Sequence, residues 1–225
     1  YMGIPVSITV EGANILTRNL MIFGQGATRC HPFVLKEMEV AAMDDDDAAL
    51  EQFDGLLMKH IVFALSNASM ALVHGLTRSY FAKAPVCGET AVYYIQLGRM
   101  SRGLAFTTDV AMLMLGGELK RKEMISARLG DVLSHLYIAS TVLKRFEDEG
   151  RQQADLPFVK YAIETSLYAI GQAFDGFFKN FSNPVINFAL KRIVFPLGNH
   201  YHKPSDAIAQ RICEHMTQPG VFRNR

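Results

Sequence analysis

Apolar positions along the chain follow a helical period in four segments. Apolar or small residues recur at alternating steps of four and three, which places them on one side of an α-helix. The clearest series are Ile125, Leu129, Val132, Leu136, Ala139, Leu143 and Phe146; Val159, Ile163, Leu167, Ile170, Phe174, Phe177 and Phe181; and Leu50, Phe53, Leu57, Ile61, Ala64, Ala68 and Ala71. A weaker series extends from Tyr94 to Leu115. No comparable run alternates with a period of two, so the pattern predicts an all-α chain.

Breaks between these segments carry residues that end or begin helices. Four aspartates, Asp44–Asp47, precede the helix expected from about Ala48, where carboxylates cap free amides and oppose the helix dipole. The alternative for this cluster is a metal site. Further breaks are expected at 83–89, 116–117, 148–157 and 182–184, and Pro157 suits a first helical turn. A last short helix is expected from Ser205 to about Met216.

These segments divide the chain into two expected parts. Residues 1–43 hold a lead-in and one helix, in which Pro32 predicts a bend or a restart. Residues 44–225 hold several helices, which we expect to pack antiparallel as a bundle.

Composition narrows the class of protein without identifying it. The net charge of +1 leaves no global electrostatic footprint for nucleic acid. Three widely spaced cysteines argue against a disulfide framework and for a reducing compartment, so we expect a cytoplasmic protein. No apolar stretch reaches the roughly 20 residues of a bilayer span, and the best candidate, at 104–117, carries Asp109. The chain begins "YMGIPVSI", which resembles the middle of a protein, so we expect a fragment.

Several histidines and one apolar segment suggest roles other than packing. His200 and His202 form a poor metal site without further ligands, and we expect no metal. Cys30 and His31 are adjacent, so on a helix they point apart and do not form a nucleophilic pair. The other helical histidines, at 60, 74 and 135, fit core or boundary positions. The segment "INFALKRIVFPLG" at 186–198 is either core or a membrane or partner surface.

One carboxylate near the start of the chain has a setting that suits chemistry. Glu11 precedes Gly12, which permits a tight turn, and the helix that follows could be capped by Asn14. A partly desolvated glutamate in such a turn is a stronger base, because burial raises a carboxyl pKa. Spacing alone leaves helix capping, a surface charge and catalysis all open.

The stretch "VEGANILTR" at 10–18 resembles the glutamate segment of acyl-CoA dehydrogenases, usually written Y-E-G-T-N-Q-I-Q-R. Glu11, Gly12, Asn14 and Arg18 keep the character of that pattern, whereas Val10 and Ala13 depart from it. The stretch from 116 to 150, "YHKPSD" at 201–206 and "MTQPGVFRNR" at 216–225 resemble the long C-terminal extension of bacterial long-chain members. The resemblance covers essentially all 225 residues.

The resemblance implies a flavin-dependent enzyme that takes fatty acyl-CoA as substrate. Glu11 would be the catalytic base that removes the α proton, and its amide with Gly12 would hold the thioester oxygen of the substrate. Ala13 and Asn14 would lie along FAD, which accepts the hydride and yields trans-2-enoyl-CoA, the first product of β-oxidation. Arg18 either belongs to this pattern or makes a structural salt bridge. The resemblance further implies an electron-transfer flavoprotein or another electron acceptor as a partner. It also implies a homo-oligomer and peripheral contact with the inner membrane.

The same resemblance indicates what the chain lacks. In that family an N-terminal helical domain and a middle β-domain build most of the flavin and acyl pockets, so we expect this chain alone to be inactive. The alternative is a non-catalytic helical module for interaction, oligomerisation or membrane docking.

Overall fold

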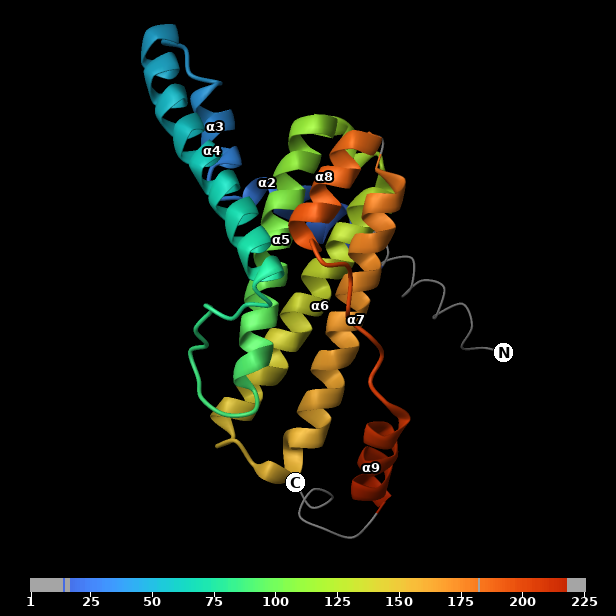
Figure 1. Ribbon diagram of the computed structural model, residues 1–225. Coiled ribbons are helices and arrows are strands. Elements are labelled where there is room, and N and C mark those ends of the chain that lie inside the picture. Colours follow the sequence, from blue (N-terminus) through green and yellow to red (C-terminus); the bar gives the residue numbers. More distant parts are fainter. Residues whose placement is uncertain (1–13, 15–16, 182, 218–225) are drawn as a thin grey trace, which may run out of the picture.

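The computed structural model describes residue 14, residues 17–181 and residues 183–217, and this part of the chain is helical without a strand (Figure 1). Its elements are η1 (Thr17–Gln25), α2 (Gly26–Arg29), α3 (Val34–Val40), α4 (Asp46–Leu76), α5 (Ala91–Leu115), η2 (Gly116–Lys120), α6 (Glu123–Asp148), η3 (Gln153–Asp155), α7 (Leu156–Asn180), α8 (Pro184–Val194) and α9 (Asp206–Thr217). The predicted all-α class is confirmed.

Three long helices, α5, α6 and α7, form the body of the molecule, and α8 closes one end (Figure 1). The two clearest apolar series predicted from the sequence are buried along their whole length on α6 and α7. The phenylalanines of α7 continue into a cluster with Phe195, where Phe174 and Phe195 meet edge to face at 5.8 Å. Each large side chain buried in this way stabilises the fold by roughly 1.5–3 kcal/mol, so the bundle has a core of its own.

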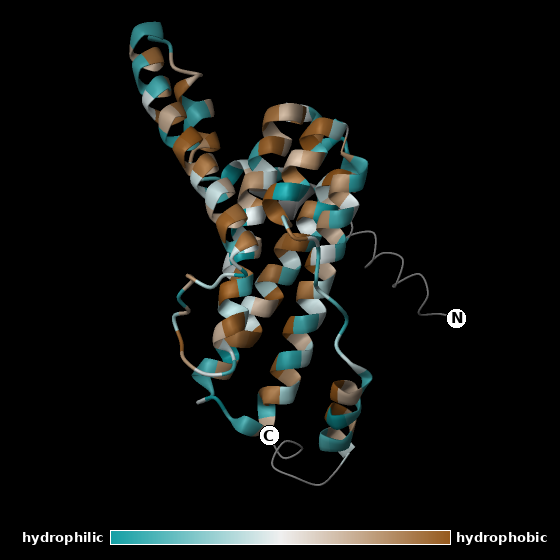
Figure 2. Ribbon diagram, viewed as in Figure 1, coloured by the Kyte–Doolittle hydropathy of each residue, from teal (hydrophilic) through white to brown (hydrophobic). Residues whose placement is uncertain are grey.

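Helix α4 departs from the prediction, because its apolar series is not core. Together with α3 it projects beyond the bundle as a two-helix arm, and apolar positions are visible along it (Figures 1 and 2). Of the predicted series, Leu50, Leu57 and Ile61 are exposed, and only Ala71 is buried. The helix was predicted correctly, but the bundle that should cover this face is absent along most of its length in the described part of the chain.

Helix α4 also meets the length and hydropathy expected of a membrane span. An 18-residue window within Asp46–Leu76 has a mean hydropathy of 1.5, and 6% of that window is buried. The expectation that no apolar stretch approaches span length therefore needs correction, since Lys59 and the small polar residues of α4 conceal the stretch in the sequence. Length and composition are its only membrane features, and the core helix of a soluble protein can share them.

Helix ends follow the predicted punctuation. Asp45 is the N-cap of α4, and its carboxylate accepts a hydrogen bond from the Ala48 amide at 3.1 Å. Asn183 caps α8 by accepting from the Val185 and Ile186 amides. A restart at Pro32 is confirmed as well, because α2 ends at Arg29 and α3 begins at Val34.

Candidate functional site

The predicted catalytic turn falls largely outside the described residues. Glu11, Gly12 and Ala13 lie there, so their predicted roles stay predictions. Asn14 is described as an exposed residue. The helix that follows, η1, packs on α6, and Arg18 forms an ion pair with Asp131 at 3.1 Å. Of the two roles left open for Arg18, the structure shows the salt bridge, which joins the segment after the turn to the bundle.

Four titratable side chains from separate segments meet where the arm joins the bundle. His31, which precedes α3, donates from Nε2 to Asp109 Oδ1 on α5 at 2.8 Å. His60 on α4 donates from Nδ1 to Glu37 Oε1 on α3 at 2.9 Å, while its Nε2 lies 3.6 Å from Asp109 Oδ1. All four side chains are largely buried. These contacts hold the base of the α3–α4 arm against α5.

The hydrogen bonds of this network favour protons over a metal ion. Ligand atoms of His31, His60 and Asp109 lie within 4.8 Å of one another, which is close enough for a shared cation. However, the Phe33 and Val34 amides both donate to His31 Nδ1 at 3.2 Å. A nitrogen that accepts cannot carry the proton, so the proton of a neutral His31 is on Nε2, the atom that a metal would need. The network therefore joins α3, α4 and α5 through hydrogen bonds and ion pairs.

Other candidate residues from the sequence take different places. Cys30 is exposed, and the neighbouring His31 ring is committed to Asp109 and to the amides of α3. His200 and His202 are both exposed, and His200 lines a pocket. In α8, Leu190 and Val194 are buried while Val185 and Phe188 are exposed, so the segment has both a core face and an open face.

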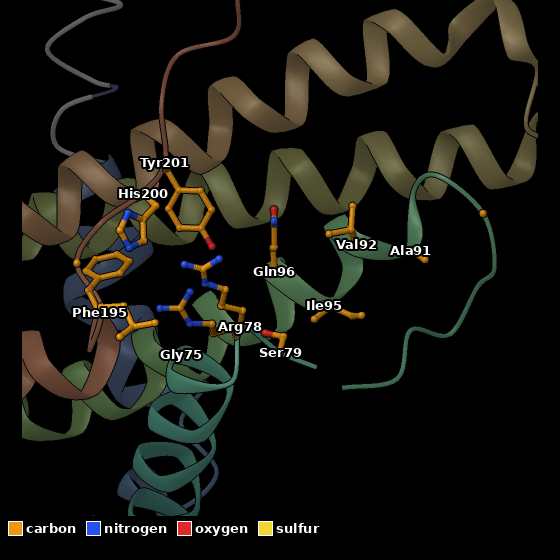
Figure 3. A pocket seen from close by; sticks show the side chains of 14 residues that line it. Gly75, Arg78, Ser79, Ala91, Val92, Ile95, Gln96, Phe195, His200 and Tyr201 are labelled. Carbon is orange, nitrogen blue, oxygen red and sulfur yellow. The ribbon is translucent and has the colours of Figure 1, made fainter. Parts of the chain in front are cut away.

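A large cavity lies between the end of α4, the start of α5 and the segment after α8 (Figure 3). Its volume is about 680 Å³. The lining residues are Gly75, Arg78, Ser79, Gly88, Ala91, Val92, Ile95, Gln96, Arg99, Phe195, Leu197, Gly198, His200 and Tyr201. No Asp or Glu is among these residues.

Arg99, which lines this cavity, and His74, the residue before the lining Gly75, both have lowered pKa values. Burial lowers the pKa of the Arg99 guanidinium, and a hydrogen bond with Tyr201 opposes the shift. Burial also lowers the pKa of His74, and the positive charges of Arg102 and Arg99 lower it further. Arginine stays protonated in proteins, so the cavity is bordered by positive charge while His74 favours its neutral form.

Sequence reasoning missed this cavity, because its basic residues come from three distant segments. Arg78 follows α4, Arg99 lies on α5 and His200 lies in the connection to α9. The sequence offers a signal only at His200, in the "HYH" stretch, whose two histidines are a poor metal site.

Comparison with known proteins yields one family. The model of a family described as acyl-CoA dehydrogenase, C-terminal, bacterial type, matches residues 28–225. The match crosses the boundary expected at residue 43, and it stops short of Glu11. No solved structure matches the chain.

Proposed function

The chain belongs to the bacterial-type acyl-CoA dehydrogenase C-terminal family, and on this premise we propose that it is the C-terminal part of an enzyme that converts fatty acyl-CoA to trans-2-enoyl-CoA. The observation that carries the proposal is the family match over residues 28–225, together with the glutamate segment "VEGANILTR" at 10–18, which lies upstream of the matched region. Residues 1–43 would complete the catalytic helical domain, and residues 44–225 would form the extension.

In this proposal Glu11 is the base of the reaction. Its carboxylate accepts the α proton of the acyl thioester as the α C–H bond breaks, and the electron pair of that bond forms the new double bond. The Glu11 and Gly12 amides donate to the thioester oxygen, which stabilises the negative charge that develops there. A thioester α proton is weakly acidic, so the base needs a raised pKa and a site that excludes water.

The flavin, when bound, supplies the acceptor for the hydride that leaves the β carbon. Of the residues assigned to it, Ala13 and Asn14, only Asn14 is described, and its exposed amide can donate to and accept from a cofactor. One exposed amide does not make a pocket. The rest of the flavin site would therefore come from protein outside this chain.

The proposal is tested on the complete enzyme, prepared from the coding sequence that includes the region upstream of Tyr1. Adding a fatty acyl-CoA without oxygen should bleach the flavin absorbance as the substrate is oxidised, and an electron-transfer flavoprotein should restore it. A complete protein that carries flavin but is not bleached by acyl-CoA of any chain length would overturn the proposal.

The exposed apolar face of the α3–α4 arm favours a second candidate, a module that contacts another protein or a bilayer. Met58, Val62 and Leu65 on α4 and Met38 on α3 are each 57–62% exposed. Met58, Val62 and Leu65 follow one another at steps of four and three, which places them on one side of α4, and large exposed apolar patches often mark contact sites. This role is compatible with the first, because the same chain can hold the base and a contact surface.

Replacing Val62 and Leu65 by lysine tests this second candidate without altering the buried bundle. If the arm is a contact surface, the double variant should lower the oligomeric mass measured by light scattering, or abolish flotation with liposomes. Lysines at Glu51 and Asp54, two exposed positions nearer the tip of the arm, are the control. Unchanged mass and unchanged flotation in both variants would contradict a contact role for the arm.

A further inference from the structure

We propose that the cavity between α4, α5 and the segment after α8 binds a small molecule that carries a phosphate monoester on an apolar or aromatic group. This inference rests on the cavity alone and is independent of the proposed dehydrogenase function.

The size and shape of the cavity suit such a ligand. Its volume of about 680 Å³ lies within the ~300–1,000 Å³ range of small-molecule sites. Three separate segments form its walls, and Pro196 packs against the backbone of Gly75, where an added Cβ would lie 2.6 Å from Pro196 Cγ. The wall is thus held by a close contact that only glycine permits.

Uncompensated positive charge is the feature that points to an anion. Arg78 and Arg99 line the cavity with His200, and no carboxylate joins them among the described lining residues. The ion pairs within the described part of the chain involve neither arginine. Two guanidinium groups beside one cavity repel each other unless an anion lies between them, and phosphate oxygens accept their hydrogen bonds in a geometry that matches the planar fork.

Arg99 is fixed in place before any ligand arrives. Its Nη2 donates to the Val194 carbonyl at 2.6 Å, it hydrogen-bonds Tyr201, and its guanidinium lies 5.7 Å from the centre of the Phe195 ring. Its Nε is buried and has no partner in the described part of the chain. An arginine that is ordered in advance loses little entropy on binding.

The backbone that carries Arg78 is strained. Arg78 and Ser79 have φ values of 49° and 61°. These values lie in the left-handed region of backbone conformation, which residues other than glycine, asparagine and aspartate seldom adopt. The Ser79 amide and hydroxyl both donate to the His74 carbonyl, at 2.7 and 3.3 Å, which holds this turn. Backbone strain of about 1–3 kcal/mol per residue is typical of ligand sites, where it places side chains that a relaxed turn would direct elsewhere.

The two ends of the cavity differ in polarity, which indicates the organic part of the ligand. Arg78, His200 and Tyr201 gather toward one end, together with the Phe195 ring, whereas Val92 and Ala91 lie toward the other (Figure 3). Ile95 and Leu197 add further apolar surface to the lining. A free phosphate ion would leave this surface unused, so a phosphate ester with a hydrophobic or ring substituent fits better than the ion alone.

Titration calorimetry of the chain with adenosine 5′-monophosphate, inorganic phosphate and adenosine tests the site. The monophosphate should bind most tightly, inorganic phosphate more weakly and adenosine not measurably. Raising the salt concentration should weaken the binding of both anions. Vesicles with and without phosphatidic acid distinguish a soluble ester from a lipid headgroup as the source of the same phosphate monoester.

Arg78→Gln should weaken the monophosphate about tenfold or more, because it removes one charge-assisted contact. Arg211→Gln, at an exposed arginine on α9 outside the cavity, is the matched control and should leave affinity unchanged. Circular dichroism verifies folding, and Ser79→Ala serves as a second variant if Arg78→Gln does not fold. Equal affinity in Arg78→Gln, Ser79→Ala and the unaltered chain, or no binding of any phosphate ester at millimolar concentration, would overturn the proposal.

Discussion

At the scale of single residues, two glycines of α4 lie in opposite surroundings. A Cβ at Gly75 would meet Pro196 Cγ at 2.6 Å, whereas a Cβ at Gly55 would meet no atom within 4 Å. Gly75→Ala should therefore lower the free energy of unfolding by roughly 1–3 kcal/mol, as overpacking does. Gly55→Ala should raise it by about 1 kcal/mol, the difference in helix propensity.

Urea unfolding of both variants measures these two changes. The pair shares one helix and one chemical change, so a common shift of the same sign would contradict the close contact between Gly75 and Pro196.

His74 should make stability depend on pH. Its pKa is lowered in the folded chain by burial and by Arg102 and Arg99, from an ordinary value of 6.5. Below that pH the unfolded chain takes up a proton that folded His74 resists, so this stability is present above about pH 6.5 and is lost as the pH falls below it. His74→Gln should reduce the loss of unfolding free energy between about pH 7.5 and 5.5.

The exposed His202 gives the comparison, since His202→Gln should leave that acid dependence intact. Equal acid sensitivity in the two variants would contradict a stabilising role for neutral His74.

At the scale of elements, helices α4 and α7 share the same apolar periodicity, but their apolar side chains are buried to different extents. Ile163 on α7 is fully buried, and Leu57 on α4 is 38% exposed, although both occupy a predicted apolar series. Ile163→Ala should lower the free energy of unfolding by about 2–5 kcal/mol through the cavity it leaves. Leu57→Ala should cost less than about 1 kcal/mol, and equal losses in chemical unfolding would mean that the arm is covered.

Elements and caps could be predicted from the sequence because their causes are local. Asp45, one of the four aspartates expected to cap, is the N-cap of α4, and the period of apolar residues marks α6 and α7. Burial of α4 could not be predicted, since periodicity shows that a helix has an apolar face but not what covers it.

The polar sites escaped prediction for a different reason. His31, His60 and Asp109 are separated by many residues and meet only because three segments pack together. Arg78 and Arg99 likewise lack any motif that joins them, and the αL conformation of Arg78 is set by its turn rather than by its residue type. The role proposed for Glu11 rests on resemblance, because a single carboxylate beside a glycine has no distinctive spacing of its own.

At the scale of the whole molecule, the described chain has a bundle core of its own, and in the proposed enzyme other domains would build most of the flavin pocket. Purified alone, it should retain FAD well below one equivalent, because its assigned flavin residues supply one exposed amide among those described. The flavin absorbance of the purified chain measures this. Stoichiometric FAD in the isolated chain would contradict the view that other domains build the pocket.

The most direct measurement is the rate of flavin reduction by a fatty acyl-CoA in the complete enzyme with Glu11→Gln, followed by stopped-flow absorbance without oxygen. Glutamine keeps the shape of the side chain and removes its basicity, so the rate should fall by roughly 10²–10⁴-fold while flavin content stays the same. Glu39→Gln, at an exposed glutamate of α3, should retain the full rate. Undiminished reduction in the Glu11→Gln enzyme would place the base elsewhere and contradict the central claim.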